Sequence, residues 1–126
     1  LMNKTRMNIW GRDFELEVYY RTNAENIISE EQKDAYRTFT QPGVELESAL
    51  TKLKEYIENN YPDRIQEEKI SNIFRYIIPK IIFIPRQKEG KIVALLCDFA
   101  FDIEHGIALV FRDGAIKEIG SQDIIL

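Results

Sequence analysis

The chain has 126 residues, 44% of them hydrophobic and 30% charged, which is the composition of a single soluble globular domain spanning residues 1–126. The net charge of −4 argues against nucleic-acid binding, which normally needs a basic surface. No apolar run is long enough to span a bilayer, and the single cysteine excludes a disulfide within the chain. We therefore expect a cytoplasmic protein that has no cofactor and binds no membrane.

The first predicted element is a β-hairpin. Residues 14–21 alternate between apolar and polar side chains, with Phe14, Leu16 and Val18 on the same side. This alternation is typical of a strand that has one face in water. A short strand over residues 7–10 precedes it.

The middle of the chain has helical spacing. Ser29 and Gln32 have the form of a capping box, which predicts the start of a helix that ends at Gln41-Pro42-Gly43. Apolar residues recur at steps of four and three from Leu46 to Ile57, which predicts a second helix with one apolar stripe. Similar spacing predicts a third helix that stops near Pro79 and contains Ile70, Ile73, Phe74 and Ile77.

From residue 80 onward the pattern is that of strands. Residues 80–85 form a short β-branched and aromatic run, and residues 91–101 are apolar on both alternating faces as far as Asp98. The second pattern is typical of a central strand that is covered on both sides. Two further strands flank Asp113-Gly114, a pair that favours a two-residue hairpin turn.

Strands and helices are therefore segregated along the chain, which indicates an α+β fold. We predict an antiparallel sheet of five to six strands, with the helical middle segment packed on one face.

Charge is distributed unevenly in the second half of the chain. Residues 72–97 carry a net charge of +4, and residues 98–126 carry a net charge of −4. One interpretation is that neighbouring strands of opposite charge pair on the solvent face of the sheet. The other is that the acidic segment forms a surface that meets a partner.

The densest polar cluster consists of Asp98, Asp102, Glu104 and His105. If the chain stays extended from residue 98 to residue 104, the three carboxylates share one face and form a binding site with His105. We expect no bound metal; if a divalent cation binds, its ligands are Asp98, Asp102 and Glu104. If the protein is an enzyme, Asp102, Glu104 and His105 are the candidates for acid–base catalysis.

The same residues also have a purely structural interpretation. Carboxylates at the end of a strand commonly cap turns through backbone N–H groups, and Asp102 is well placed to do so. Gly106 then supplies the backbone freedom that such a turn requires.

The run from Asp102 to Phe111 is followed by Arg112-Asp113-Gly114 and by a glycine-polar segment over residues 120–123. This arrangement resembles a family of uncharacterised small bacterial domains that share an Asp-x-Glu-His-Gly turn before an apolar strand. Such domains are similar in size and style to the immunity proteins that neutralise bacterial toxins. The resemblance implies relatedness, and it carries no catalytic residue over to this chain.

Three hypotheses for the function follow. The first is a bacterial interaction protein, immunity-like in style, that meets another protein through an acidic surface around residues 98–123, as a monomer or a dimer. The second is a divalent-metal-dependent hydrolase that uses Asp98, Asp102, Glu104 and His105. The third is a structural domain in which the turn at residues 102–106 only fixes the register of the strands.

Overall fold

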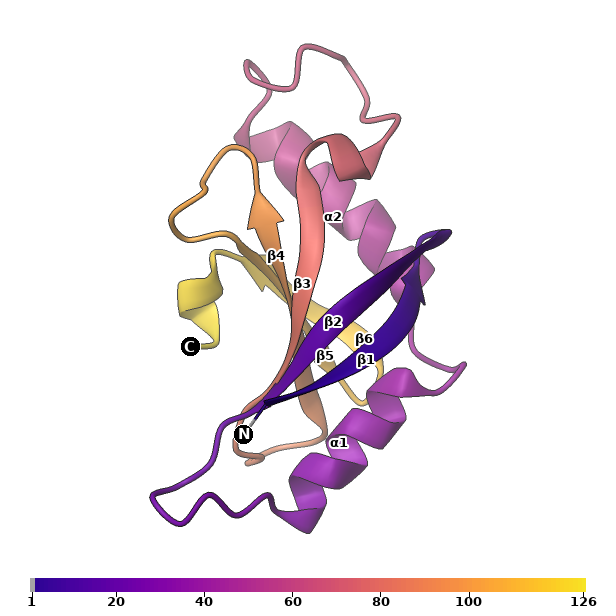
Figure 1. Ribbon diagram of the computed structural model, residues 1–126. Coiled ribbons are helices and arrows are strands. Elements are labelled where there is room, and N and C mark those ends of the chain that lie inside the picture. Colours follow the sequence, from indigo (N-terminus) through magenta and orange to yellow (C-terminus); the bar gives the residue numbers. More distant parts are fainter. Residues whose placement is uncertain (1) are drawn as a thin grey trace.

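Six strands form one sheet in the computed structural model, which describes residues 2–126 (Figure 1). The strands lie side by side in chain order: β1 (Met2–Ile9), β2 (Arg12–Tyr20), β3 (Ile77–Ile84), β4 (Ile92–Phe99), β5 (Ile107–Arg112) and β6 (Ala115–Gly120). Two α-helices, α1 (Glu30–Thr40) and α2 (Leu46–Asn60), lie between β2 and β3. Two short 3₁₀ helices complete the chain, η1 (Ile73–Arg75) and η2 (Gln122–Ile124).

The sheet is mixed, because β2 and β3 run parallel while the other four neighbouring pairs are antiparallel. The prediction of an antiparallel sheet is therefore wrong at this one pair. The helices account for the difference, since a parallel pair needs a long crossover connection and both helices lie in that connection.

Two of the three predicted helices are present, and the start of α1 has the predicted capping box. The Ser29 hydroxyl accepts a hydrogen bond from the Gln32 backbone N–H at 3.1 Å, and the Gln32 side chain accepts one from the Ser29 N–H at 3.0 Å. This capping box satisfies two backbone groups at the start of α1. In α2, Leu53 and Ile57 of the predicted stripe are buried.

The predicted third helix is wrong. Its segment contains only the three-residue η1, and β3 already begins at Ile77 and runs through Pro79. Proline lacks the N–H that a regular ladder needs, and the register between β3 and β4 shifts directly after Pro79. Ile70, Ile73 and Ile77 are all buried, so their spacing reflected burial rather than an α-helix.

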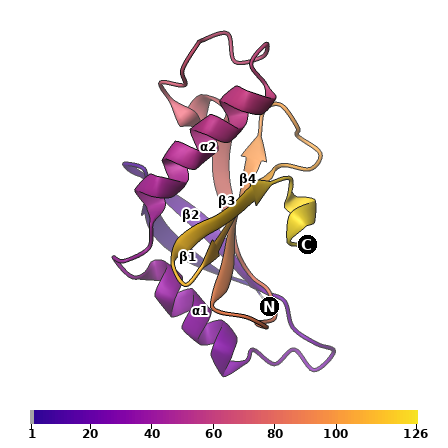
Figure 2. The same ribbon diagram turned by 180° about the vertical axis from the view of Figure 1, so that it is seen from behind.

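The alternating residues of the strands form two separate apolar clusters. The larger cluster joins Leu16, Leu95 and Leu109 of the sheet to the buried helix residues, among them Phe39 and Leu53. In Figure 1 the helix α2 lies behind the sheet, and in Figure 2 it lies in front. The smaller cluster consists of Phe83, Ala94, Leu96, Ala108 and Val110, and we call the side of the sheet that carries it the second face.

The second face is covered in part by the end of the chain. Ile125 packs against the smaller cluster, together with Ile81 and Ile92. Residues 93–97 of β4 are buried, which confirms the prediction that this strand is covered on both sides. Within residues 2–126, no helix is long and apolar enough to cross a membrane.

Candidate functional site

The chain turns directly after β4, so the predicted row of carboxylates does not form. The strand ends at Phe99, and the Asp102 carbonyl accepts a hydrogen bond from the Gly106 N–H at 2.8 Å. Gly106 has a φ of +60°, a left-handed conformation that glycine adopts without strain. Asp98 therefore lies on the strand, whereas Asp102 and Glu104 lie in the turn.

The structure brings together two of the four predicted site residues, Asp102 and His105. The Asp102 carboxylate accepts a hydrogen bond from the His105 backbone N–H at 3.1 Å, and the same oxygen lies 3.1 Å from His105 Nδ1. The backbone hydrogen bond lowers the pKa of Asp102. The hydrogen bond to Asp102 raises the pKa of His105, and the negative charges of Glu104 and Asp123 act in the same direction. This pair stabilises the turn, as the structural interpretation predicts.

Asp98 and Glu104 do not form a metal site with Asp102. The Asp98 carboxylate lies on β4, 3.9 Å from the Lys80 ammonium on β3, and Glu104 is exposed in the turn. Among residues 2–126, no three side chains of His, Cys, Asp or Glu are grouped in a way that would hold a metal ion.

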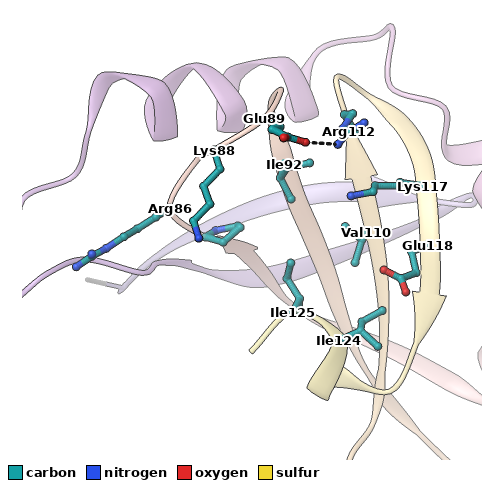
Figure 3. A pocket seen from close by; sticks show the side chains of 11 residues that line it. Arg86, Lys88, Glu89, Ile92, Val110, Arg112, Lys117, Glu118, Ile124 and Ile125 are labelled. Carbon is teal, nitrogen blue, oxygen red and sulfur yellow. Dashed lines mark ion pairs between the residues drawn. The ribbon is translucent and has the colours of Figure 1, made fainter.

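A groove on the second face combines an apolar floor with a charged rim, and the sequence analysis did not identify it (Figure 3). The groove has a volume of 330 Å³, which lies in the lower range of small-ligand sites. Five apolar residues form the floor and one adjoining wall, Pro85, Ile92, Val110, Ile124 and Ile125. Six charged residues line the rim, Arg86, Lys88, Glu89, Arg112, Lys117 and Glu118, and the Arg86 guanidinium extends away from the others (Figure 3). We call this site the basic groove, because its cations outnumber its carboxylates.

A β-bulge in β6 brings two consecutive charged residues to the groove. Val110 pairs with Glu118, but the next residue, Phe111, pairs with Ile116, so Lys117 is an extra residue in β6. Side chains normally alternate between the faces of a strand, and a bulge interrupts that alternation. Lys117 and Glu118 therefore both point from β6 toward the groove (Figure 3).

The end of the chain forms one wall of the groove, and the turn after β4 holds it in place. The Gln122 backbone N–H donates to the His105 carbonyl at 3.2 Å, and the Gln122 side-chain amide donates to the Cys97 carbonyl at 3.2 Å. A Cβ atom at Gly106 would lie 2.7 Å from the Cys97 carbonyl oxygen and would also collide with the Gln122 amide. The close approach of the C-terminal segment therefore needs a glycine at this position.

Most of the cationic charge in the groove is not neutralised. Arg112 Nη2 lies 3.6 Å from a Glu89 oxygen, but the Glu89 side chain is 85% exposed, so this ion pair is weak. Arg112 Nε is buried and has no hydrogen-bond partner in the described part of the chain. Arg86, Lys88 and Lys117 form no ion pair with any residue from 2 to 126.

The groove collects cations from both charged segments of the sequence. Arg86 and Lys88 come from the basic segment, in the loop between β3 and β4. Arg112 and Lys117 are the two cations of the acidic segment, residues 98–126, and both line the groove. Two of the four cations of the groove therefore come from a segment that has a negative net charge.

Several carboxylates of the acidic segment form hydrogen bonds or ion pairs with other residues of the domain. Asp102 caps the turn, and Asp113 accepts a hydrogen bond from the Lys91 N–H at 2.9 Å. Asp98 pairs with Lys80 across neighbouring strands, as the first interpretation of the charge pattern predicts.

The family model described as "Domain of unknown function (DUF6985)" matches residues 2–126. The chain belongs to this family. No curated protein and no solved structure matches the chain. The family is an uncharacterised one.

Proposed function

We propose that this DUF6985 domain is a binding domain that recognises another protein through the basic groove. The observation that carries the proposal is the coincidence of three features at one place on the second face: a hollow, an apolar floor and cations without an ion-pair partner among the described residues. Protein-binding sites commonly combine an apolar centre with a polar, charged rim.

The residues of the groove favour binding over catalysis. Its lining contains no Ser, Thr, Cys or His side chain among the residues that the structure describes, so no hydroxyl or thiol nucleophile and no imidazole base faces the groove. The His105–Asp102 pair is part of a turn and is not among the residues that line the groove. The turn that this pair caps contacts Gln122 of the C-terminal segment through the His105 backbone carbonyl.

The proposal differs from the first hypothesis in the surface that it uses. That hypothesis placed the partner on an acidic surface, but Asp102 and Asp113 of that segment accept backbone hydrogen bonds within the domain. The basic groove contains cations without an ion-pair partner among the described residues, and these are available to a ligand. The immunity-like role is the special case in which the bound protein is a toxin.

Affinity capture with charge-reversed variants tests the proposal. Wild type is compared with two double variants. The groove variant is Lys88→Glu/Lys117→Glu. The helix variant is Lys33→Glu/Lys52→Glu on α1 and α2, and it changes the net charge of the domain by the same amount as the groove variant. We expect one protein to be retained by wild type and by the helix variant, and to be lost by the groove variant. Binding of the identified, purified partner is then measured with the same three proteins. Equal retention by all three proteins would contradict the proposal.

A fourth variant tests the acidic surface directly. Glu104→Lys/Asp123→Lys reverses two exposed carboxylates near the turn after β4. We expect this variant to retain the partner. Loss of the partner here, with retention by the groove variant, would restore the acidic surface as the binding site.

A further inference from the structure

We infer that the basic groove binds an acidic segment of the partner protein, in which one large apolar side chain lies beside carboxylates. The inference rests on the proposed function and adds the chemistry of the ligand. It follows from the size of the apolar floor, from the position of the cations, and from the shape of the strand edge beside the groove.

The apolar floor has room for one large side chain of the ligand. Val110 and Arg112 are two residues apart on β5, a step of about 6.6 Å along the strand. The groove extends across β4, β5 and β6, and neighbouring strands lie about 4.8 Å apart. A floor of these dimensions, formed by Ile92, Val110 and Ile125, fits one leucine-sized or phenylalanine-sized group.

Arg112 is the anchor for a carboxylate. Its ion pair with Glu89 is exposed and weak, and the Arg112 side chain is 42% exposed, so its outer guanidinium nitrogens are accessible to a ligand. An arginine binds a carboxylate most strongly through two parallel hydrogen bonds, which the long contact with Glu89 does not provide. A carboxylate of the ligand therefore displaces Glu89 at little cost and makes a stronger pair with Arg112.

Two lysines supply the complementary charge for further acidic residues. Lys117 extends from β6 toward the groove, and Lys88 extends toward it from the loop between β3 and β4 (Figure 3). Both cations lack an ion-pair partner in the described chain. They lie on different sides of the apolar floor, so acidic residues on both sides of the apolar side chain are favoured.

The rim disfavours a uniform polyanion such as a nucleic acid. Glu89 and Glu118 lie among the cations, and the whole chain carries a net charge of −4, both of which repel a continuous row of phosphates. A peptide has separated charges and an apolar side chain between them, which matches both the rim and the floor.

The ligand lies in the groove rather than pairing with the edge strand β6. A regular edge is needed to add a strand, and the bulge at Lys117 interrupts this edge. The ligand therefore binds mainly through contacts with side chains of the second face. For its affinity, the apolar group is as important as the charge.

Fluorescence polarisation with short labelled peptides tests the inference. The first peptide has phenylalanine between two glutamates in a serine-glycine background; the second replaces both glutamates with glutamine, and the third replaces phenylalanine with alanine. We expect binding of the first peptide, weakened by added salt, and much weaker binding of the other two. A labelled single-stranded DNA serves as the polyanion, and tighter binding of this DNA would overturn the inference.

Two single variants should change the affinity for the first peptide in opposite directions. Arg112→Gln should weaken binding by roughly tenfold or more, since a charge-assisted hydrogen bond is lost. Glu89→Gln should strengthen binding by about two- to fivefold, since it removes the internal competitor. Glu15→Gln makes the same charge change at an exposed residue that pairs with Lys4 outside the groove, and should have no effect.

The outcomes separate this inference from the proposed function. Equal strengthening by Glu89→Gln and Glu15→Gln would show an effect of net charge alone and would overturn the role of Arg112. If no peptide binds while capture of the partner still depends on Lys88 and Lys117, the inference fails and the proposed function stands. If neither the peptides nor the partner depend on the groove, both fail.

Discussion

The backbone carbonyl of His105 accepts a hydrogen bond from the backbone N–H of Gln122, and this contact joins the turn after β4 to the end of the chain. Two residues further on, Ile124 begins the apolar wall of the basic groove. In both views of the ribbon the C-terminal segment lies beside the loop between β4 and β5 (Figures 1 and 2). The turn that stands out in the sequence therefore supports the groove without lining it.

Gly106→Ala should lower the free energy of unfolding by about 2–3 kcal/mol, because alanine adds strain at a positive φ and its Cβ collides with the C-terminal segment. Urea denaturation measures this loss. Gly11→Ala is the control, since Gly11 also has a positive φ but has nothing within 4 Å of an added Cβ. Equal losses at the two positions would contradict the role of Gly106 in close packing.

The stability of the domain should fall as the pH rises past the pKa of His105. Asp102 raises this pKa in the folded state. The stability that protonated His105 contributes is therefore fully present below the ordinary pKa of 6.5, and it is lost as the pH rises through the higher pKa of the folded state. Thermal melts across this pH range should show the step in wild type and not in His105→Gln. A step of the same size in His105→Gln would assign the effect to another group.

The contribution of Asp102 to the stability of the domain should be lost at acid pH, whereas that of His105 is lost as the pH rises. The pKa of Asp102 is lowered in the folded state, so its contribution is present above the ordinary value of 3.8 and is lost as the pH falls through the lower folded value. Melts of wild type and Asp102→Ala should differ at pH 5 and converge in strong acid. A difference between the two proteins that does not depend on pH would mean that the charge of Asp102 has no role.

Arg112→Met should raise the free energy of unfolding by about 1 kcal/mol, because it replaces a buried nitrogen that lacks a hydrogen bond with apolar atoms. Urea denaturation again gives the value, and Lys117→Met, at an exposed position on the same rim, should change stability little. A gain in stability at Arg112 together with a loss of ligand binding would indicate that this residue serves binding rather than folding. Marked destabilisation by Arg112→Met would show instead that the guanidinium holds the fold.

Ile125→Ala should lower the free energy of unfolding by about 1–2 kcal/mol, since this half-buried side chain packs on the cluster of the second face. Leu126→Ala is the matched control, because the Leu126 side chain next to it is 55% exposed. A thermal melt that ranks the two variants in the reverse order would contradict the proposed packing of the C-terminal wall.

Local signals in the sequence predicted much of the fold. The capping box of α1 and the Asp113-Gly114 hairpin each depend on a few adjacent residues, and both have the predicted conformation, with φ of +51° at Asp113 and +85° at Gly114. The parallel pairing of β2 with β3 depends on residues more than fifty positions apart, and no local pattern encodes it. The apolar spacing before Pro79 suited a helix as well as a buried loop and strand, and the helix was the wrong choice.

The candidate site was less predictable than the fold. Asp102 and His105 were found because they are close in sequence, and they do form a pair. The groove was missed because its lining comes from the loop before β4, from three strands and from the C-terminal segment. A partial signal was present, since Arg112 and Lys117 are the two cations of an acidic segment, but the bulge that turns Lys117 toward the groove is visible only in the strand register.

We infer that the basic groove binds an acidic segment with one apolar side chain. Titration of the isotope-labelled domain with the phenylalanine-glutamate peptide, followed by backbone amide NMR shifts, tests it most directly. We expect the largest shifts to gather at Ile92, Val110, Arg112 and Ile125. Shifts that gather instead around Glu104, or no shifts at all, would contradict it.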